Sequence, residues 1–241
     1  MKRFIWVFLG VLLFLLVFTF LLPLKDVAVE GENSYYSENE LIARVMEGKS
    51  SRALIFYLQE KLGRHSAIPF IEKYTVRFNG FRHAVITVYE RKVIGFLRFQ
   101  QYCLYFDWNG TLVESSLLRL PGICEVTGLG NSQAVLGGKL ETAYPDCFSS
   151  ILTIIQFLDS SRITLGEREG QLSSFADRIH FSPAGISVIF GETTVLLGSS
   201  DHLEEKLSVM CDALPELYGR SGTLYLDAYK QGEAHPSYIF K

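Results

Sequence analysis

The stretch "DVAVEGENSYYSENELIARV", residues 26–45, decides how the first part of this chain folds. Val27 and Val29 alternate with small or polar neighbours, which is typical of a short strand. A run of Gly, Glu, Asn and Ser then interrupts the pattern. Ser37 precedes a helical pattern and Glu40 follows three residues later, which predicts a capping box at a helix start. The stretch therefore predicts a strand, a turn and a helix within twenty residues.

An uncharged apolar block precedes this stretch. Residues 4–24 contain 21 residues without a charge, which in a helix would rise ~30 Å, about one bilayer core. We expect a retained transmembrane helix rather than a cleaved signal peptide, because the block is long and no small-x-small cleavage site follows it. Lys2 and Arg3 precede the block, so the positive-inside rule predicts a cytoplasmic tail at residues 1–3. The expected localisation is thus a single-pass cell-membrane protein with an extracytoplasmic C-terminal part.

Composition and charge narrow the function further. The chain has 241 residues, of which 48% are hydrophobic, enough for one or two domains with a buried core. Beyond the apolar block the formal charge is about −5, so binding of nucleic acid through bulk charge is not expected.

The cysteines show no metal-binding or redox spacing. Cys103, Cys124, Cys147 and Cys211 include no C-x-x-C pair. Export would permit two disulfides. Cys147 and Cys211 fall on apolar faces of predicted helices, which favours buried thiols.

Residues 25–91 have the pattern of a small β-α-α-β-β domain. The first helix has an apolar stripe that includes Leu41 and Val45, and Gly48 suits its end. Two strand runs follow at residues 71–78 and 84–90. A second helix is expected at residues 52–63, between the first helix and these two strands. Its buried face is expected to consist of Leu54, Ile55, Leu58 and Leu62.

Residues 92–229 have the pattern of a β domain with two helices packed on a largely antiparallel sheet, so the fold class is α+β. Asn109-Gly110 predicts a type I′ hairpin turn. A helix is expected at residues 145–160 and another from Asp201. The last strand is "GTLYLDAY", residues 222–229. Strand runs near residues 161–168, 176–182 and 185–191 are expected to form a meander with residues 193–198.

The chain lacks the usual catalytic signatures. Gly137-Gly138-Lys139 has no upstream glycine at phosphate-loop spacing. There is no Gly-x-Ser-x-Gly elbow, and the histidines show no ligand spacing. A Ser-His-Asp triad assembled from distant segments remains an alternative at this point. We therefore expect that the protein is not an enzyme and that it binds neither a cofactor nor a metal ion.

Several of these segments resemble one family in the correct order along the chain. The opening motif resembles the start of a POTRA domain, and "VITVYERKVIGFL" resembles its closing strand, with the closing pair Glu90-Arg91. "YFDWNGTLVE", "LPGICEVTGL" and "VLLGSSDHLEEKLSVMCDAL" resemble later segments of the bacterial cell-division family FtsQ/DivIB. The opening motif consists of Val27, Val29, Gly31, Tyr36, Ser37, Glu40 and Leu41.

The resemblance implies a non-enzymatic divisome scaffold at the septum. It implies a POTRA domain at residues 25–91, a β domain at 92–229 and a C-terminal tail at 230–241. The implied partners are FtsB/DivIC-like and FtsL-like division proteins and the septal penicillin-binding protein complex, whose peptidoglycan synthesis such a scaffold regulates. The alternative is a membrane-tethered extracytoplasmic sensor or a POTRA-type assembly module.

The resemblance also implies where a partner binds. A partner segment would pair with the exposed edge of the last strand, where unpaired N–H and C=O groups accept an incoming strand. Tyr225 and Tyr229 are candidate anchors, because tyrosine is enriched among binding hot spots. The other interpretation is that the strand is internal and its tyrosines are packed. The expected edge consists of Thr223, Leu224, Tyr225, Leu226, Asp227 and Tyr229.

Overall fold

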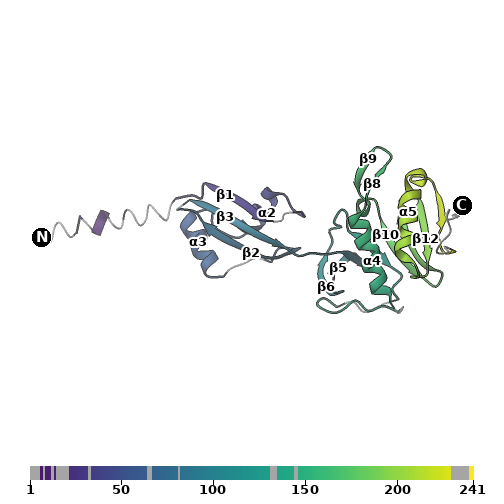
Figure 1. The fold of residues 1–241 in the computed structure, drawn as a ribbon. Coiled ribbons are helices and arrows are strands. Elements are labelled where there is room, and N and C mark those ends of the chain that lie inside the picture. The colour runs from purple at the N-terminus through teal and green to yellow at the C-terminus, as the bar shows by residue number, and fades with distance from the viewer. Residues whose placement is uncertain are drawn as a thin grey trace. The chain divides into compact units, whose positions relative to one another are not determined.

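The structure, a computed structural model, divides the chain into two compact units, Met1–Arg91 and Lys92–Lys241. Each unit is described by itself (Figure 1). The described residues are 6–7, 9–11, 14, 22–31, 34–63, 67–80, 82–130, 135–143, 146–228 and 239–241.

The first unit contains a three-stranded sheet with strand order β1-β3-β2. Strand β1 runs parallel to β3, whereas β2 runs antiparallel to it. Ala84, Ile86 and Val88 of β3 are buried while their neighbours are more exposed, so one face of the sheet carries the core. Two helices complete the unit. The elements are β1 (Asp26–Gly31), α2 (Glu38–Met46), α3 (Ala53–Lys61), β2 (Ile71–Phe78) and β3 (His83–Glu90).

The start of α2 confirms the predicted capping box. The Ser37 hydroxyl accepts the N–H of Glu40 at 3.4 Å, and the Ser37 N–H donates to the Glu40 carboxylate at 3.0 Å. Leu41 and Val45 are completely buried. Gly48 adopts φ = 70° just beyond the helix, as the helix end requires.

The predicted buried face of α3 is wrong. Leu58 and Leu62 are exposed, and Phe56 and Glu60 are buried instead. The reason lies outside the helix. Lys49 Nζ donates to the Glu60 carboxylate and to the Tyr74 hydroxyl at 2.9 Å, so a buried ion pair fixes which face turns inward.

The second unit is built on a nine-stranded mixed sheet with strand order β14-β13-β12-β11-β10-β7-β4-β5-β6. A separate two-stranded hairpin joins β8 to β9. The strands of the large sheet are β4 (Gly95–Phe99), β5 (Tyr102–Phe106), β6 (Leu112–Ser116), β7 (Cys124–Thr127), β10 (Arg178–Ser182), β11 (Gly185–Phe190), β12 (Thr193–Gly198), β13 (Gly222–Tyr225) and β14 (Ile239–Phe240). The remaining elements are α4 (Cys147–Ser160), β8 (Arg162–Leu165), β9 (Arg168–Gln171), the 3-10 turn η1 (Leu172–Ser174) and α5 (Leu203–Leu217).

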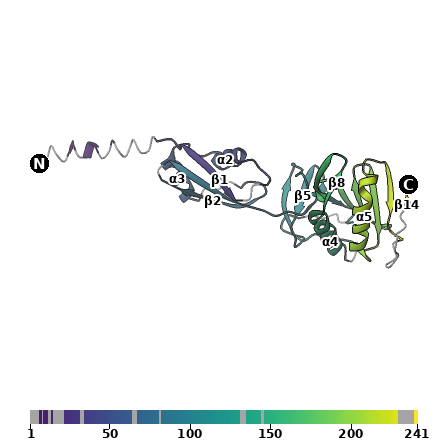
Figure 2. The same ribbon diagram turned by 45° about the horizontal axis from the view of Figure 1, so that its top comes forward.

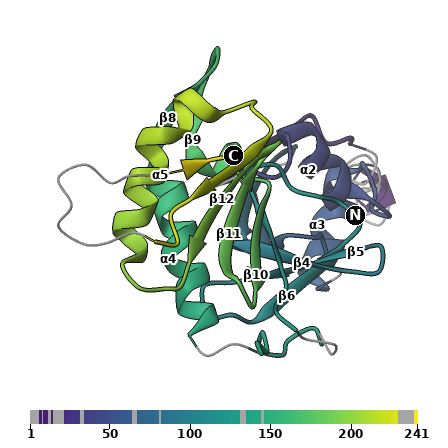
Figure 3. The same ribbon diagram turned by 90° about the vertical axis from the view of Figure 1, so that its right-hand side faces the viewer.

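One hydrophobic core fills the space between this sheet and its two helices. Helices α4 and α5 lie side by side on the same side of the sheet (Figure 3). Ile151 and Ile154 of α4, Leu207 of α5 and Val195 of β12 are completely buried in it. The α+β class expected from the sequence is therefore observed.

The turn between β5 and β6 differs from the predicted type I′ turn. Gly110 has φ = 70°, but Asn109 is not in the left-handed region, and type I′ needs positive φ at both positions. The cause is Asp107, whose carboxylate accepts the N–H groups of Asn109 at 2.9 Å and Thr111 at 2.8 Å. The side chain thus holds an Asx-type turn that the dipeptide pattern does not reveal.

The predicted four-run meander is also only partly correct. Strands β10, β11 and β12 are antiparallel neighbours, whereas residues 162–171 form the separate β8–β9 hairpin. Helix α5 begins after His202, which adopts φ = 53°, rather than at Asp201.

The expected transmembrane helix at residues 4–24, and the single-pass localisation built on it, are wrong. In the part of the chain that the structure describes, no helix is long and apolar enough to span a bilayer. A span takes ~20 helical residues, whereas α5, the longest helix described, has 15 and buries its apolar side chains in the core. Most of residues 4–24, and the predicted tail at 1–3, lie outside the described residues.

Candidate functional site

Strand β13 carries three of the six residues expected to bind a partner, Thr223, Leu224 and Tyr225. It runs parallel to β12, with Val195 opposite Leu224 and Leu196 opposite Tyr225. Leu226 extends this side of the strand, because its N–H donates to the Leu196 carbonyl at 2.8 Å. The inner side of β13 is therefore fully used by the sheet.

A buried threonine of β12 contacts the end of the helix that precedes β13. Thr193 is completely buried, and its hydroxyl lies 3.0 Å from the Leu217 carbonyl and 2.9 Å from the Arg220 carbonyl. These carbonyls belong to the end of α5 and the turn after it. The Thr193 hydroxyl can donate its one proton to either carbonyl, and it thereby links β12 to the end of α5.

Side chains alternate along β13 and divide the site into two faces. Leu224 and Leu226 are buried in the core under the helices. Tyr225 is 38% exposed and Asp227 is exposed, so both lie on the face away from that core. The proposed anchor Tyr229 lies outside the described residues.

The outer side of β13 is occupied by the chain itself. Strand β14 pairs antiparallel with β13, with Phe240 opposite Leu224 and Ile239 opposite Tyr225 (Figure 2). Thr223 donates its N–H to the Lys241 carbonyl at 2.6 Å, and Lys241 donates back to the Thr223 carbonyl at 3.1 Å. The edge expected to be open therefore accepts a strand, but in this structure the strand is residues 239–241.

Two residues that the sequence analysis did not select complete this site. A Cβ built on Gly222 would lie 2.6 Å from Cζ of Phe240, so the missing side chain at 222 makes room for the aromatic ring. Phe240 packs against the edge of the core, whereas Ile239 is 56% exposed. The signal in the sequence was the apolar run Tyr238-Ile239-Phe240.

The paired segment is short and weakly held. A hydrogen bond contributes about 0.5–1.5 kcal/mol net, whereas fixing the backbone of one residue costs about 1–2 kcal/mol. Strand β14 has two residues, compared with about five to six in an average strand. Much of what holds residues 239–241 in place is therefore the packing of Phe240.

A buried cation lies near the end of β13. Lys206 of α5 is 2% exposed, and its Nζ donates to the Ser199 carbonyl at 3.0 Å. Burial lowers the pKa of Lys206, and the nearby carboxylates of Asp201 and Asp227 act in the opposite direction.

Gly198 packs against Asp227, since a Cβ at 198 would lie 2.7 Å from the Asp227 Cβ.

The closing pair Glu90-Arg91 and Tyr36 of the opening motif each form a hydrogen bond within the first unit. The Glu90 carboxylate accepts the Tyr35 N–H at 3.1 Å, and the Tyr36 hydroxyl donates to the Pro69 carbonyl at 3.1 Å. Arg91 donates its N–H to the Phe70 carbonyl at 2.8 Å.

Three small or apolar residues of the opening motif lie in β1. Gly31 has φ = 111°, and a Cβ there would lie 2.4 Å from the Val88 carbonyl oxygen. Val27 and Val29 are half-buried. Gly31 therefore allows the close pairing of β1 with β3.

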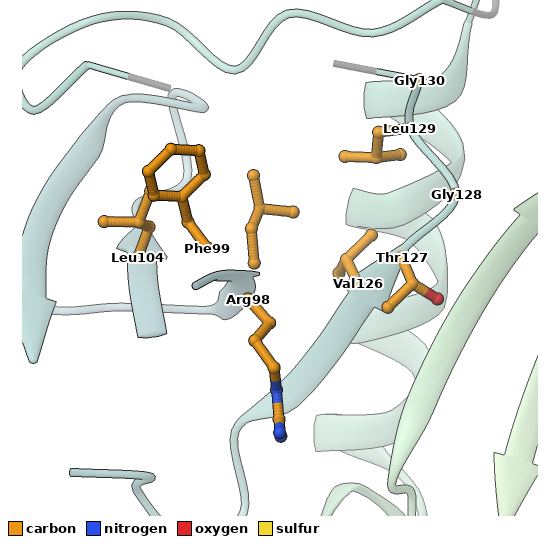
Figure 4. A pocket seen from close by; sticks show the side chains of 9 residues that line it. Arg98, Phe99, Leu104, Val126, Thr127, Gly128, Leu129 and Gly130 are labelled. Atoms are coloured by element: carbon orange, nitrogen blue, oxygen red, sulfur yellow. The ribbon is translucent and has the colours of Figure 1, made fainter. Parts of the chain in front are cut away.

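An apolar hollow of ≈220 Å³ lies elsewhere in the second unit (Figure 4). Phe99 and Leu104 face Val126 and Leu129 across it, while Arg98 points away. Arg98 Nε instead lies 3.4 Å from the buried Glu125 carboxylate. Thr127 of the hollow's lining has its hydroxyl 2.9 Å from Nδ1 of His180 in β10.

The remaining candidate chemistry is structural. The four cysteines are free thiols, of which Cys103, Cys124 and Cys147 are buried. Burial raises the pKa of Cys124 and of Cys147 to about 12. Within the described ranges, no cluster of three His, Cys, Asp or Glu side chains could hold a metal ion.

Comparison with known proteins does not identify a family. No protein-family model matches the chain, and no curated protein matches it.

Proposed function

We propose that this chain is a non-enzymatic docking scaffold of the FtsQ/DivIB type, which acts in bacterial cell division. It binds FtsB/DivIC-like and FtsL-like proteins and so regulates septal peptidoglycan synthesis. The observation that carries the proposal is that the outer side of β13 accepts an antiparallel strand. Main-chain hydrogen bonds supply the affinity of such a site, and the flanking side chains supply its specificity.

The arrangement of the first unit supports the same proposal. Its elements follow the order β-α-α-β-β, which is the order of a POTRA domain. The Glu90 carboxylate of the closing pair accepts the N–H of Tyr35 in the loop that precedes α2, next to Tyr36 of the opening motif. The scaffold then offers a small first domain and a strand-accepting second domain.

Site-specific photocrosslinking tests the proposal. A photoreactive phenylalanine analogue at Tyr225 is expected to crosslink to an FtsB/DivIC-like protein of the same organism. The matched control is the same replacement at Tyr102 of β5, which is also 38% exposed. A crosslink at 102 that equals the one at 225, or none at either position, would contradict docking at β13.

Binding measurements with alanine variants give an independent test. Truncating an interface hot spot costs about 2 kcal/mol or more, so Tyr225→Ala should weaken partner binding by a factor of roughly 30. Tyr102→Ala should leave the affinity unchanged. Circular dichroism must show that both variants stay folded. Equal affinities of the two variants would remove Tyr225 as an anchor.

A further inference from the structure

We propose that residues 239–241 are an intramolecular competitor of the partner strand, and that they keep the β13 edge closed until a partner displaces them. This inference rests on the proposed function, because it describes how the same site is regulated. It further specifies the partner as an antiparallel strand with an aromatic side chain placed over Gly222.

The backbone contacts make the two states mutually exclusive. Along one strand, alternate residues direct their N–H and C=O groups to opposite sides. The inner side of β13 is bound to β12, and the outer groups of Thr223 are both bound to Lys241. A partner strand needs those same outer groups, so it cannot pair with Thr223 while residues 239–241 are in place.

The side chains show what the site selects. Gly222 does not adopt a positive φ, so an alanine would fit its backbone conformation. An alanine would collide with Phe240, whose ring atom Cζ would lie 2.6 Å from the added Cβ, and with the Lys241 carbonyl oxygen at 2.7 Å. Gly222 therefore makes room for both the ring and the backbone of the paired strand, and a partner strand needs a comparable side chain to fill this space.

The covalent link favours the internal strand until a longer one competes. Ten residues, 229–238, join the site to Ile239, and a short link of this kind gives an effective concentration on the order of mM. The internal strand has only two residues, whereas a longer partner strand adds further ladder hydrogen bonds. A partner's apparent Kd equals its intrinsic Kd divided by the fraction of molecules in which the β13 edge is open.

A peptide probe tests the competition without any knowledge of the partner. The probe is a fluorescent peptide with the sequence HPSYIFK, residues 235–241. It is expected to bind a variant truncated after Tyr238 at least about tenfold more tightly than the full chain. Phe240→Ala at full length should also open the site, whereas Ile239→Ala, at an exposed side chain, should not. Equal binding of the probe to full-length and truncated chains would overturn the inference.

A second measurement separates this inference from the proposed function. An FtsB/DivIC-like partner is expected to bind the truncated variant about tenfold more tightly than the full chain. If the partner binds both forms equally, the internal strand is not a competitor although the docking function stands. If the partner binds neither form while the probe still binds the truncated one, the docking function fails, and with it the regulatory role of residues 239–241.

A reversible crosslink provides a control within one protein. Thr223→Cys combined with Lys241→Cys places two thiols on residues that already exchange both backbone hydrogen bonds. Oxidation should abolish binding of the HPSYIFK probe and of the partner, and reduction should restore both. Unchanged binding by the oxidised form would contradict mutual exclusion.

Discussion

The carboxylate of Glu90 accepts a hydrogen bond from the backbone N–H of Tyr35 over 3.1 Å, although 55 positions separate the two residues. Glu90 ends β3, and Tyr35 lies just before the capping box of α2. The last strand of the first unit therefore holds the loop that starts its first helix. This contact explains why residues from both ends of the unit share one structural role.

Removal of this carboxylate should destabilise the first unit. Glu90→Ala is expected to lower the free energy of unfolding by about 1–3 kcal/mol, because the Tyr35 N–H loses a part-buried partner. Glu90→Gln keeps an acceptor and should cost less. The matched control is Glu30→Ala, whose exposed pair with Arg77 at 3.7 Å should contribute about 0.5 kcal/mol or less. Chemical denaturation measures all three, and equal losses for Glu90→Ala and Glu30→Ala would contradict the assignment.

The buried pair of Lys49 and Glu60 should respond unequally to single and double replacement. Lys49→Met leaves the Glu60 carboxylate without its cation and is expected to cost about 3–5 kcal/mol. Adding Glu60→Leu should recover much of that loss, since neither charge is then buried alone. Lys61→Met at the exposed end of α3 serves as the control and should stay within about 1 kcal/mol of the parent. A double variant as unstable as Lys49→Met would count against this interpretation.

The same pair predicts how stability changes at high pH. Burial acts to lower the pKa of Lys49, but its hydrogen bonds to Glu60 and Tyr74 outweigh burial and hold that pKa above its ordinary value. A raised folded-state pKa gives stability that is present below an unfolded pKa of about 10.4 and is lost as pH rises through the folded value. Denaturation curves at pH 9 and pH 11 should therefore show a larger loss for the parent chain than for Lys49→Met with Glu60→Leu. Identical losses would show that Lys49 does not contribute to the pH dependence.

The cysteines should differ sharply in reactivity. Burial raises the pKa of Cys124 and Cys147 to about 12, so almost no thiolate is present at pH 8. Cys211 is half-buried and is expected to react first with a thiol reagent, although burial raises its pKa as well. Cys211→Ser should abolish the fast phase, and all four thiols should react after denaturation. A fast phase that persists in Cys211→Ser would contradict this order.

One tyrosine hydroxyl should contribute measurably to the second unit. The Tyr105 hydroxyl donates to the Leu118 carbonyl at 2.7 Å and accepts the Leu120 N–H at 2.9 Å. Tyr105→Phe removes the hydroxyl and both of these hydrogen bonds, and is expected to lower the free energy of unfolding by about 1–3 kcal/mol. Tyr102→Phe, at a more exposed position on the same strand, is the control. Two variants of equal stability would show that the hydroxyl does not hold residues 118–120.

Local chemistry explains what could be predicted from the sequence. The capping box of Ser37 and Glu40 depends on groups three residues apart, so its pattern is visible in one stretch. The alternation in β1 and the order β-α-α-β-β are likewise written in short-range periodicity. The turn at Asn109-Gly110 was placed correctly, but its type was not, because the Asp107 side chain takes part in it.

Contacts between distant segments explain what could not be predicted. Periodicity favoured Leu58 and Leu62 for the buried face of α3, but Lys49, which also donates to Tyr74, pairs with Glu60 and holds that side inward. An apolar block suggested a membrane span, yet no helix in the described part of the chain meets the required length and apolarity.

The candidate site shows the same division most clearly. The sequence by itself predicted a strand at residues 222–229 after an amphipathic helix, since that pattern is local, whereas β13 ends at Tyr225. Only the tertiary structure decided that Leu224 and Leu226 face the core, and that residues 239–241 close the outer side of the strand. The physical reason is that a strand leaves half of its backbone groups for neighbours that can come from anywhere in the chain.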